Sequence, residues 1–118
     1  MTPTIVLKDD KPFLILGSPG GSTIITTVLQ TILNVTVHNM GIQEAVSAPR
    51  IHSQWLPDVI MAEPYSIIKD VEESLKSKGH IIEPYKWSKI GEMNAILINE
   101  NGYFGAADTR GENAAVGY

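Results

Sequence analysis

The sequence predicts an α+β fold built on an antiparallel sheet. Two hairpin patterns lie near the two ends of the chain, and helical periodicity fills much of the segment between them. Such an order lacks the strand–helix alternation of a doubly wound parallel fold. With 118 residues, the chain is expected to form a single domain over residues 1–118, or a fragment of a larger domain.

The first hairpin is expected near the amino terminus. Residues 4–7 and 12–16 are short apolar runs, and the charged residues 8–11 between them suit a turn. Residues 17–22, Gly-Ser-Pro-Gly-Gly-Ser, then end the strand pattern.

A long helix is predicted over residues 23–38. Its apolar positions form two adjacent rows at helical spacing, made of Ile24, Val28, Ile32 and Val35 and of Ile25, Leu29 and Leu33. The opposite side is rich in threonine and carries no charge. Because β-branched residues lower helix propensity, tertiary packing must hold this helix, and its uncharged polar side suggests contact with more protein.

The middle of the chain is expected to hold shorter elements. Residues 42–48 predict a helix that Pro49 ends, residues 50–58 an irregular segment with Trp55 in a packed loop, and residues 59–62 a strand. A helix is predicted from Ser66 to Lys78, with Ile67, Ile68, Val71 and Leu75 facing inward.

The remaining elements are strands. Residues 81–85 predict a strand that Pro84 restricts to a sheet edge. Residues 94–98 and 103–107 flank a four-residue turn and predict the second hairpin, and residues 108–118 are expected to be extended.

Composition excludes several classes of function. The chain has no cysteine, which rules out a disulfide scaffold, a thiolate zinc site, an iron–sulfur cluster and a cysteine nucleophile. Nine basic residues are scattered among thirteen acidic ones, so neither nucleic acid nor an anionic membrane is an expected partner. Residues 1–8 do not form a signal peptide, and no window approaches the roughly 18 apolar residues of a membrane span.

The glycine-rich segment is the most informative candidate site, because it joins a strand to the amino end of the longest helix. Glycines let backbone N–H groups approach a negative atom, and the helix terminus adds partial positive charge, so the loop can bind an anion or an oxyanion. It matches neither a Walker loop nor G-x-G-x-x-G. A tight turn that needs glycine only for its dihedral angles is the competing interpretation.

Other polar residues give weaker signals. His38, His52 and His80 have no partner at helical spacing, so packing or surface roles are expected and no metal site is predicted. Asp108, Arg110 and Glu112 are expected to form a salt bridge that anchors the carboxy-terminal segment, in preference to an acid–base pair.

Ser18 and Ser22 lack a nucleophile elbow and are interpreted as caps or turn formers. Trp55 and Trp87 are expected to fill a core. The residues alone therefore indicate one anion-stabilising loop, without a nucleophile or a base.

The same residues resemble a known family. Met-Thr-Pro-Thr-Ile-Val at residues 1–6, the glycine-rich segment running into residues 24–30, Glu-Ala-Val-Ser-Ala-Pro-Arg at 44–50, and Gly-Tyr-Phe-Gly-Ala-Ala-Asp at 102–108 stand in the order found in the small catalytic subunit of γ-glutamyltranspeptidase. The resemblance covers essentially the whole chain and extends to its last two residues. Thr109 departs from it, since proline is common there.

This resemblance implies an Ntn-hydrolase αββα sandwich, in which helices flank two stacked antiparallel sheets. It also implies a precursor that cleaves itself and exposes an amino-terminal threonine as nucleophile for γ-glutamyl transfer from glutathione to water, an amino acid or a peptide. Gly20 and Gly21 match the backbone donors of the oxyanion hole. The threonine, the residues that hold the substrate α-amino group and the paired serines that bind its carboxylate all match positions ahead of Met1.

The leading hypothesis is therefore a carboxy-terminal portion of the small subunit that is inactive by itself and needs no cofactor. Its expected partners are the remainder of the small subunit and the large subunit, or a second copy through an exposed sheet, and a glutathione-type substrate binds only the complete enzyme. A non-catalytic assembly module and a small anion-binding domain are the alternatives. The family is usually periplasmic or extracellular, and the location of this chain stays open.

Overall fold

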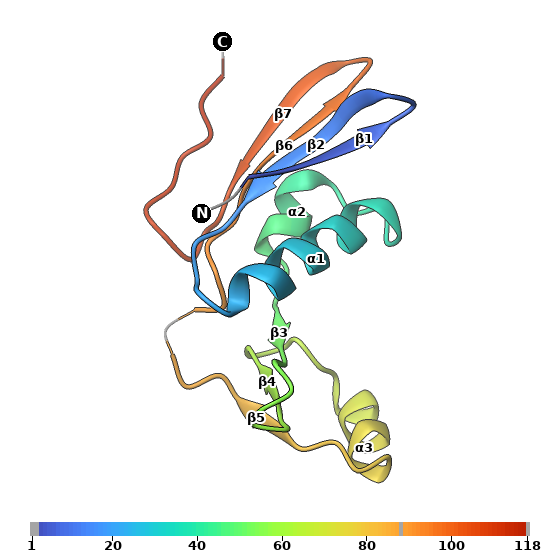
Figure 1. Ribbon diagram of the computed structural model, residues 1–118, viewed down its shortest axis with the longest axis vertical. Coiled ribbons are helices and arrows are strands. Elements are labelled where there is room, and N and C mark those ends of the chain that lie inside the picture. The colour runs from blue at the N-terminus through green and yellow to red at the C-terminus, as the bar shows by residue number, and fades with distance from the viewer. Residues whose placement is uncertain (1–2, 88, 118) are drawn as a thin grey trace.

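The structure is a computed structural model that describes residues 3–87 and 89–117. Two parts are visible in Figure 1: a four-stranded sheet with helices α1 and α2 at one end, and a smaller sheet with helix α3 at the other. In chain order, the elements are β1 (Thr4–Lys8), β2 (Lys11–Gly17), α1 (Thr23–Thr36), α2 (Ile42–Ser47), β3 (Ile51–His52), β4 (Ile60–Ala62), α3 (Lys69–Ser77), β5 (Ile82–Pro84), β6 (Asn94–Asn99) and β7 (Gly102–Ala107).

The larger sheet has the strand order β1-β2-β6-β7 and is antiparallel throughout. Both predicted hairpins are confirmed. Strand β2 pairs with β6 so that Leu14 lies opposite Leu97 and Leu16 opposite Ala95. The first and second hairpins therefore lie side by side in one sheet, joined through their inner strands.

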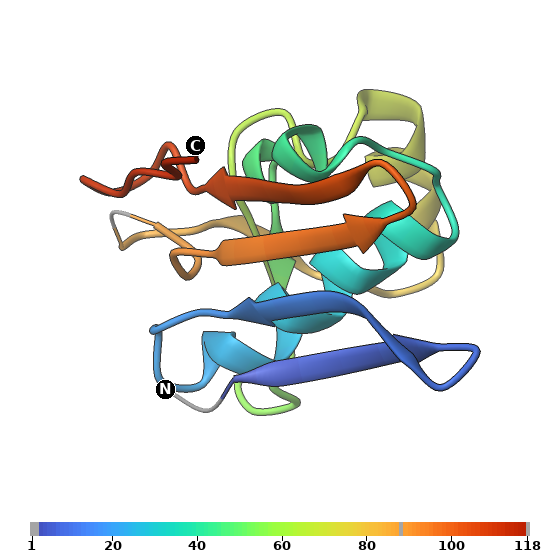
Figure 2. The same ribbon diagram turned by 90° about the horizontal axis from the view of Figure 1, so that it is seen from above.

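One face of this sheet forms the core. Side chains alternate between the two faces of a strand, so Leu14, Leu16, Ala95 and Ala106 point to the same side. Helices α1 and α2 cover that side, and they lie behind the strands in Figure 2. Burying a leucine fully, as at Leu14, contributes about 2 kcal/mol of stability. The buried apolar cluster consists of Leu14, Leu16, Val35, Ile42, Ala45, Val46, Met93, Ala95 and Ala106.

The opposite face of the sheet is also apolar. Ile5, Ile15 and Ile96 lie side by side across three strands, and Ile5 is 59% exposed. Residues 114–116 of the carboxy-terminal segment line a cavity over part of this face. Strands that are apolar on both faces are typical of a sheet covered on both sides. The outer face is thus suited to contact with further protein.

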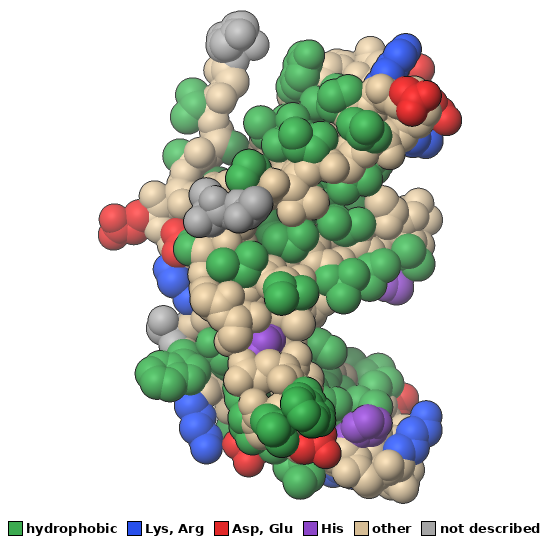
Figure 3. Space-filling view, viewed as in Figure 1, with side chains coloured by type: hydrophobic (Ala, Val, Ile, Leu, Met, Phe, Trp, Pro, Cys, Tyr) green, Lys and Arg blue, Asp and Glu red, His purple; other side chains and the backbone are tan. Residues whose placement is uncertain are grey.

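The threonine side of helix α1 faces the interior of the protein. Thr23, Thr27 and Thr31 are buried, whereas Ile25 is 77% exposed and Leu29 is also exposed. The predicted apolar stripe is therefore split. Val28, Ile32 and Val35 pack on the sheet, while the second row, made of Ile25, Leu29 and Leu33, adds to the apolar side chains visible on the surface in Figure 3. The threonine side was expected to contact further protein, and in the structure it packs on β3 and on the loop at Gly91 of this same chain.

The smaller sheet holds most of the differences from prediction. Strand β3 was expected to be irregular, and it pairs antiparallel with β4 over two residues. Strand β5 is an edge strand as predicted, and it runs parallel to β4. The inward apolar side predicted for α3 is confirmed only in part, because Ile67 and Leu75 are half-buried whereas Ile68 and Val71 are exposed. The helix begins after Ile68, since the Ser66 hydroxyl donates to the Glu63 carbonyl instead of capping the helix.

Candidate functional site

The glycine-rich segment connects β2 to the amino end of α1. Gly20 has a φ of +141° and Gly21 a φ of +59°, values that favour glycine. At Gly20 space is also short, because a Cβ atom would lie 2.4 Å from the Thr23 hydroxyl oxygen. The shape of the turn itself therefore requires glycine at position 20 and favours it at position 21, as the competing interpretation of this loop supposed.

The glycine carbonyls start helix α1. The carbonyl of Gly20 accepts hydrogen bonds from the backbone N–H and the hydroxyl of Thr23, and that of Gly21 accepts from the N–H of Ile24. Among the described residues, no hydrogen bond uses the N–H of Gly20 or Gly21. Both glycines are exposed at a helix amino terminus, where partial positive charge gathers. Two neighbouring donors are thus available for a negative atom.

A second loop, residues 89–93 just before β6, supports this turn and is called the supporting loop below. Ser18 is fully buried, and its hydroxyl accepts a hydrogen bond from the Glu92 N–H at 2.8 Å while it donates to the Pro19 carbonyl. Gly91 packs so closely on α1 that a Cβ atom there would lie 2.5 Å from the Thr27 hydroxyl and 2.7 Å from that of Ser18. This close contact explains why the side of α1 that faces Gly91 carries small threonines.

Ser18 therefore acts as a turn former, as predicted. Ser22 occupies the N-cap position of α1 without a side-chain capping bond. Thr23 supplies the local side-chain bond instead, through its hydroxyl group.

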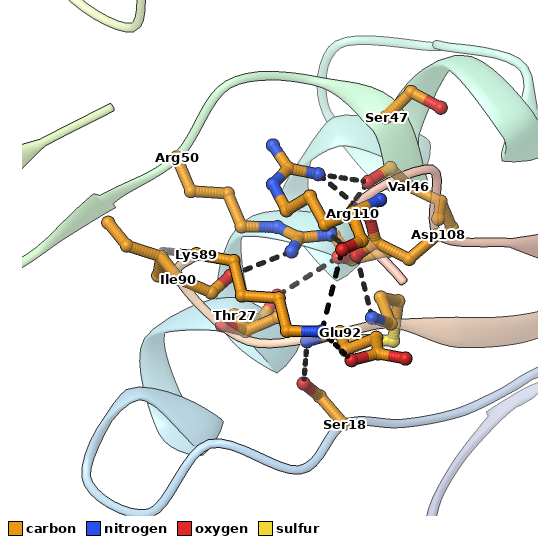
Figure 4. A network of polar contacts seen from close by, with 12 residues as sticks. Ser18, Thr27, Val46, Ser47, Arg50, Lys89, Ile90, Glu92, Asp108 and Arg110 are labelled. Carbon is orange, nitrogen blue, oxygen red and sulfur yellow. Dashed lines mark hydrogen bonds and ion pairs between the residues drawn. The ribbon is translucent and has the colours of Figure 1, made fainter. Parts of the chain in front are cut away.

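Behind the supporting loop lies a network of two arginines and two carboxylates, Arg50, Arg110, Asp108 and Glu63. Figure 4 shows Arg50, Asp108 and Arg110. Arg50 and Asp108 are buried, and Arg110 and Glu63 are half-buried. Arg50 is 2% exposed and forms an ion pair with Asp108 at 2.8 Å. It also donates to the carbonyls of Ile90 and Val46. The network therefore ties the carboxy-terminal segment to the supporting loop and to α2.

Arg110 forms the other half of the network. It contacts Asp108 at 3.0 Å and donates twice to Glu63, at 2.6 and 2.9 Å. The predicted salt bridge that anchors the carboxy-terminal segment is confirmed for Asp108 and Arg110, whereas Glu112 is exposed. Sequence reasoning gave no role to Arg50 and missed Glu63, because only the fold brings β4 beside the carboxy-terminal segment.

The network lowers the pKa of both carboxyl groups. Burial raises the pKa of Asp108, but hydrogen bonds from the Met93 and Arg110 N–H groups and the charge of Arg50 outweigh burial, so the net shift is downward. For Glu63, burial likewise opposes the Arg110, Ile90 and Arg50 hydrogen bonds, and the pKa is again lowered. Both groups therefore favour the folded state when they are ionised.

Acid is expected to destabilise the fold through these two groups. The pKa values of Asp108 and Glu63 are lower in the folded state than in the unfolded state. Their full contribution to the free energy of unfolding is therefore present at pH values above the ordinary carboxyl pKa of about 4, and it is lost as the pH falls through the lowered folded-state pKa values. The free energy of unfolding from urea titrations should thus fall below about pH 4. An Asp108→Asn variant should show a shallower fall, and a Glu112→Gln control the same fall as wild type. Equal pH profiles for all three would contradict the assignment.

The other predicted residues lie apart from the glycine turn or on the surface. His52 is buried and bonds Thr26 at 2.8 Å and Gln54 at 3.0 Å, which confirms a packing role. His38 and His80 are exposed. Within residues 3–87 and 89–117, no group of three or more potential metal ligands is found, and no helix is long and apolar enough to cross a bilayer.

The prediction that both tryptophans fill a core was wrong. Trp55 is 79% exposed, in a loop that was expected to be packed, and Trp87 is 75% exposed. Trp87 lines an open cavity of about 390 Å³ beside Gly20, which the sequence did not indicate.

Comparison with known proteins identifies the family. A family model described as Gamma-glutamyltranspeptidase matches residues 1–118. The chain belongs to the γ-glutamyltranspeptidase family. The resemblance inferred from the sequence is thereby confirmed.

Individual members show how much of their own length the chain matches. The chain is 40% identical over 120 residues to the glutathione hydrolase proenzyme of Escherichia coli, covering all of this chain and 20% of that protein. It is 43% identical over 119 residues to the Bacillus subtilis glutathione hydrolase proenzyme, covering 99% and 20%. The chain thus spans about one fifth of the length of the curated relatives that it matches.

A solved structure gives the same result for the fold. A mutant of Helicobacter pylori γ-glutamyltranspeptidase matches with a TM-score of 0.85 and 49% identity, covering 94% of this chain and 61% of that one. The predicted α+β fold of the Ntn-hydrolase type, with antiparallel strands flanked by helices, is confirmed.

Proposed function

We propose that this chain is the carboxy-terminal portion, residues 1–118, of a γ-glutamyltranspeptidase small subunit, and that Gly20 and Gly21 supply the backbone donors of its oxyanion hole. The observation that carries the proposal is the pair of exposed N–H groups at the amino end of α1, unused by any hydrogen bond of the described residues. In the complete enzyme the reaction is γ-glutamyl transfer from a glutathione-type amide to water, an amino acid or a peptide.

The chemistry follows from the charge that develops on the substrate. When the threonine hydroxyl attacks the γ-glutamyl carbonyl carbon, an oxygen–carbon bond forms and the carbonyl oxygen becomes an oxyanion. Two fixed N–H donors stabilise this oxyanion more than the neutral carbonyl, which lowers the barrier. The carbon–nitrogen bond then breaks, the amine leaves with a proton, and water or an acceptor amine cleaves the ester in the second step.

The partners in this proposal are the remainder of the small subunit and the large subunit. The apolar outer face of the sheet, with Ile5, Ile15 and Ile96 in register, supports a covering layer from outside these residues. An unpartnered apolar face of this kind usually marks an interaction surface. A second copy of the chain on the same face is the competing occupant, and it corresponds to the non-catalytic assembly module.

A substitution at Gly21 tests the oxyanion hole. No atom lies within 4 Å of the position that a Cβ atom would take there, so a Gly21→Val change acts through the positive φ and not through a clash. In the complete enzyme it should lower kcat by about 100-fold or more, the cost of losing one oxyanion donor.

Gly79 offers a matched control. It has a φ of +92° and equally open space, at the end of α3. Gly79→Val should impose similar backbone strain while leaving kcat close to that of the parent enzyme. A folded Gly21→Val enzyme with the kcat of the Gly79→Val enzyme would refute the proposed role of the loop.

A further inference from the structure

The Ser18 hydroxyl links the supporting loop to the peptide group that precedes Gly20. It accepts a hydrogen bond from the Glu92 N–H at 2.8 Å (Figure 4) and donates to the Pro19 carbonyl at 2.6 Å. A hydroxyl has a single proton, and because Ser18 is the acceptor toward Glu92, that proton remains for Pro19. Ser18 is also fully buried, so its hydroxyl has a defined position.

The bond to Pro19 determines where the Gly20 N–H points. The peptide group between these two residues is planar and trans, so its carbonyl and its N–H point in opposite directions. The proline ring fixes φ, which leaves ψ of Pro19 as the rotation that turns this peptide plane. A hydrogen bond that holds the Pro19 carbonyl therefore also holds the Gly20 N–H.

The second proposed donor is held in the same way. The N–H of Gly21 belongs to the peptide group that carries the Gly20 carbonyl. This carbonyl accepts bonds from the N–H of Thr23 at 3.1 Å and from its hydroxyl at 2.9 Å. Since glycine rotates more freely than any other residue, two successive glycines need such restraints. Each donor is thus restrained through the carbonyl of its own peptide group.

We infer that Ser18 is a positioning residue for the oxyanion hole, which holds the Pro19–Gly20 peptide so that the Gly20 N–H is aimed at the developing oxyanion. The inference rests on the proposed function, because it takes Gly20 as one of the donors. A hydrogen bond to a carbonyl also polarises the amide, which strengthens its N–H as a donor. Ser18 is buried and acts only through this peptide group.

A Ser18→Ala substitution in the complete enzyme tests the inference. It leaves the Gly20 N–H present but free to turn, so kcat should fall about tenfold, less than for the loss of a whole donor. KM for a γ-glutamyl anilide should stay within about twofold, because the neutral carbonyl depends less on the donors than the oxyanion does. Ser18→Cys keeps a similar shape but donates weakly, and it should lower kcat with less loss of stability.

A transition-state analogue separates poorer alignment from a loss of folded enzyme. A substrate analogue with a boronic acid in place of the γ-amide forms a tetrahedral adduct with the threonine hydroxyl, and one adduct oxygen takes the place of the oxyanion. Its inhibition constant should rise about tenfold in Ser18→Ala, in step with the fall in kcat/KM. A smaller folded fraction would lower the measured kcat without changing this constant.

Two other hydroxyl residues provide matched controls. Ser22 lies in the same segment, is exposed and makes no capping bond, so Ser22→Ala should leave kcat at the parent value. Thr31 is buried in α1, and its hydroxyl donates to the Thr27 carbonyl at 2.9 Å. Thr31→Val therefore removes a buried hydrogen bond away from the turn, and it should lower stability while leaving kcat and the inhibition constant unchanged.

A spectroscopic signal of the peptide group itself separates this inference from the proposed function. Proline labelled with ¹³C at the carbonyl and glycine labelled with ¹⁵N select Pro–Gly peptides in nuclear magnetic resonance, and residues 19–20 are the one such pair in this sequence. In the complete enzyme, the signal is assigned by its absence in Pro19→Ala. It should shift in Ser18→Ala and keep its position in Thr31→Val.

The possible outcomes are distinct. A shifted signal together with the tenfold changes in kcat and in the inhibition constant would support the positioning role. An unshifted signal, or an unchanged kcat and inhibition constant, in Ser18→Ala would overturn the inference, while a slow Gly21→Val enzyme would still support the oxyanion hole. A Gly21→Val enzyme with the kcat of its Gly79→Val control would instead refute the proposed function, even if the signal shifts in Ser18→Ala.

Discussion

The purified 118-residue chain is expected to release no amine from a chromogenic γ-glutamyl anilide. Its proposed contribution to catalysis is a pair of backbone donors at Gly20 and Gly21, and donors alone cannot replace the acyl-enzyme route. Removing the nucleophile of a hydrolase that forms an acyl-enzyme costs about a million-fold in kcat. Supplying the remainder of the small subunit, with its threonine, together with the large subunit should therefore raise activity by a factor of that order.

The decisive control is the same longer protein with that threonine replaced by alanine, which should be as inactive as the 118-residue chain. This design also separates the competing hypotheses. A non-catalytic module that pairs through the outer sheet face would gain no activity from the added segment. Measurable turnover by the 118-residue chain itself would disprove the division of roles proposed for Gly20, Gly21 and the threonine.

Replacing Asp108 with alanine is expected to destabilise the chain by about 3–5 kcal/mol, the cost of leaving a buried charge without its partner. The Asp108 carboxylate contacts Arg50 at 2.8 Å and Arg110 at 3.0 Å, and it accepts the Met93 N–H at 2.7 Å. Its loss leaves Arg50 buried at 2% exposure with only carbonyl partners besides. Urea unfolding followed by circular dichroism measures the change.

Glu112 supplies the matched control for this substitution. It lies four residues further on in the same segment and is exposed, so Glu112→Ala should change stability by less than about 0.5 kcal/mol. A double variant with leucine at both Arg50 and Asp108 should cost less than the two single changes together, because no unpaired charge remains between these positions. An Asp108→Ala chain as stable as the Glu112→Ala chain would show that the network contributes little.

Much of the fold could be predicted because its signals are local. Turn residues between short apolar runs mark both hairpins, charged at 8–11 and rich in asparagine and glycine at 99–102, and residues 17–22 mark the start of α1. The Asp108–Arg110 pair was predictable for the same reason, since its two members are two residues apart. The short strand β3 was missed because two residues carry no periodic signal.

Burial was harder to predict, and α1 shows why. Hydrophobic periodicity places its apolar stripe on one side, yet Thr27 is fully buried and Ile25 is exposed. The difference arises from the close approach of Gly91, which leaves room only for small side chains on that side of the helix. The exposed tryptophans have a related origin, since an apolar residue marks a core only when other elements surround it.

The sequence by itself determined the family, the two hairpins and the glycine turn at Gly20 and Gly21, because each depends on neighbouring residues and on the intrinsic conformational freedom of glycine. Only the tertiary structure decided which helix side is buried, how Glu63 and Arg50 join Asp108 and Arg110, and that Trp87 and Lys89 stand beside the glycine turn. These features join residues far apart in the chain, and a contact between distant residues exists only after folding has closed the loops between them.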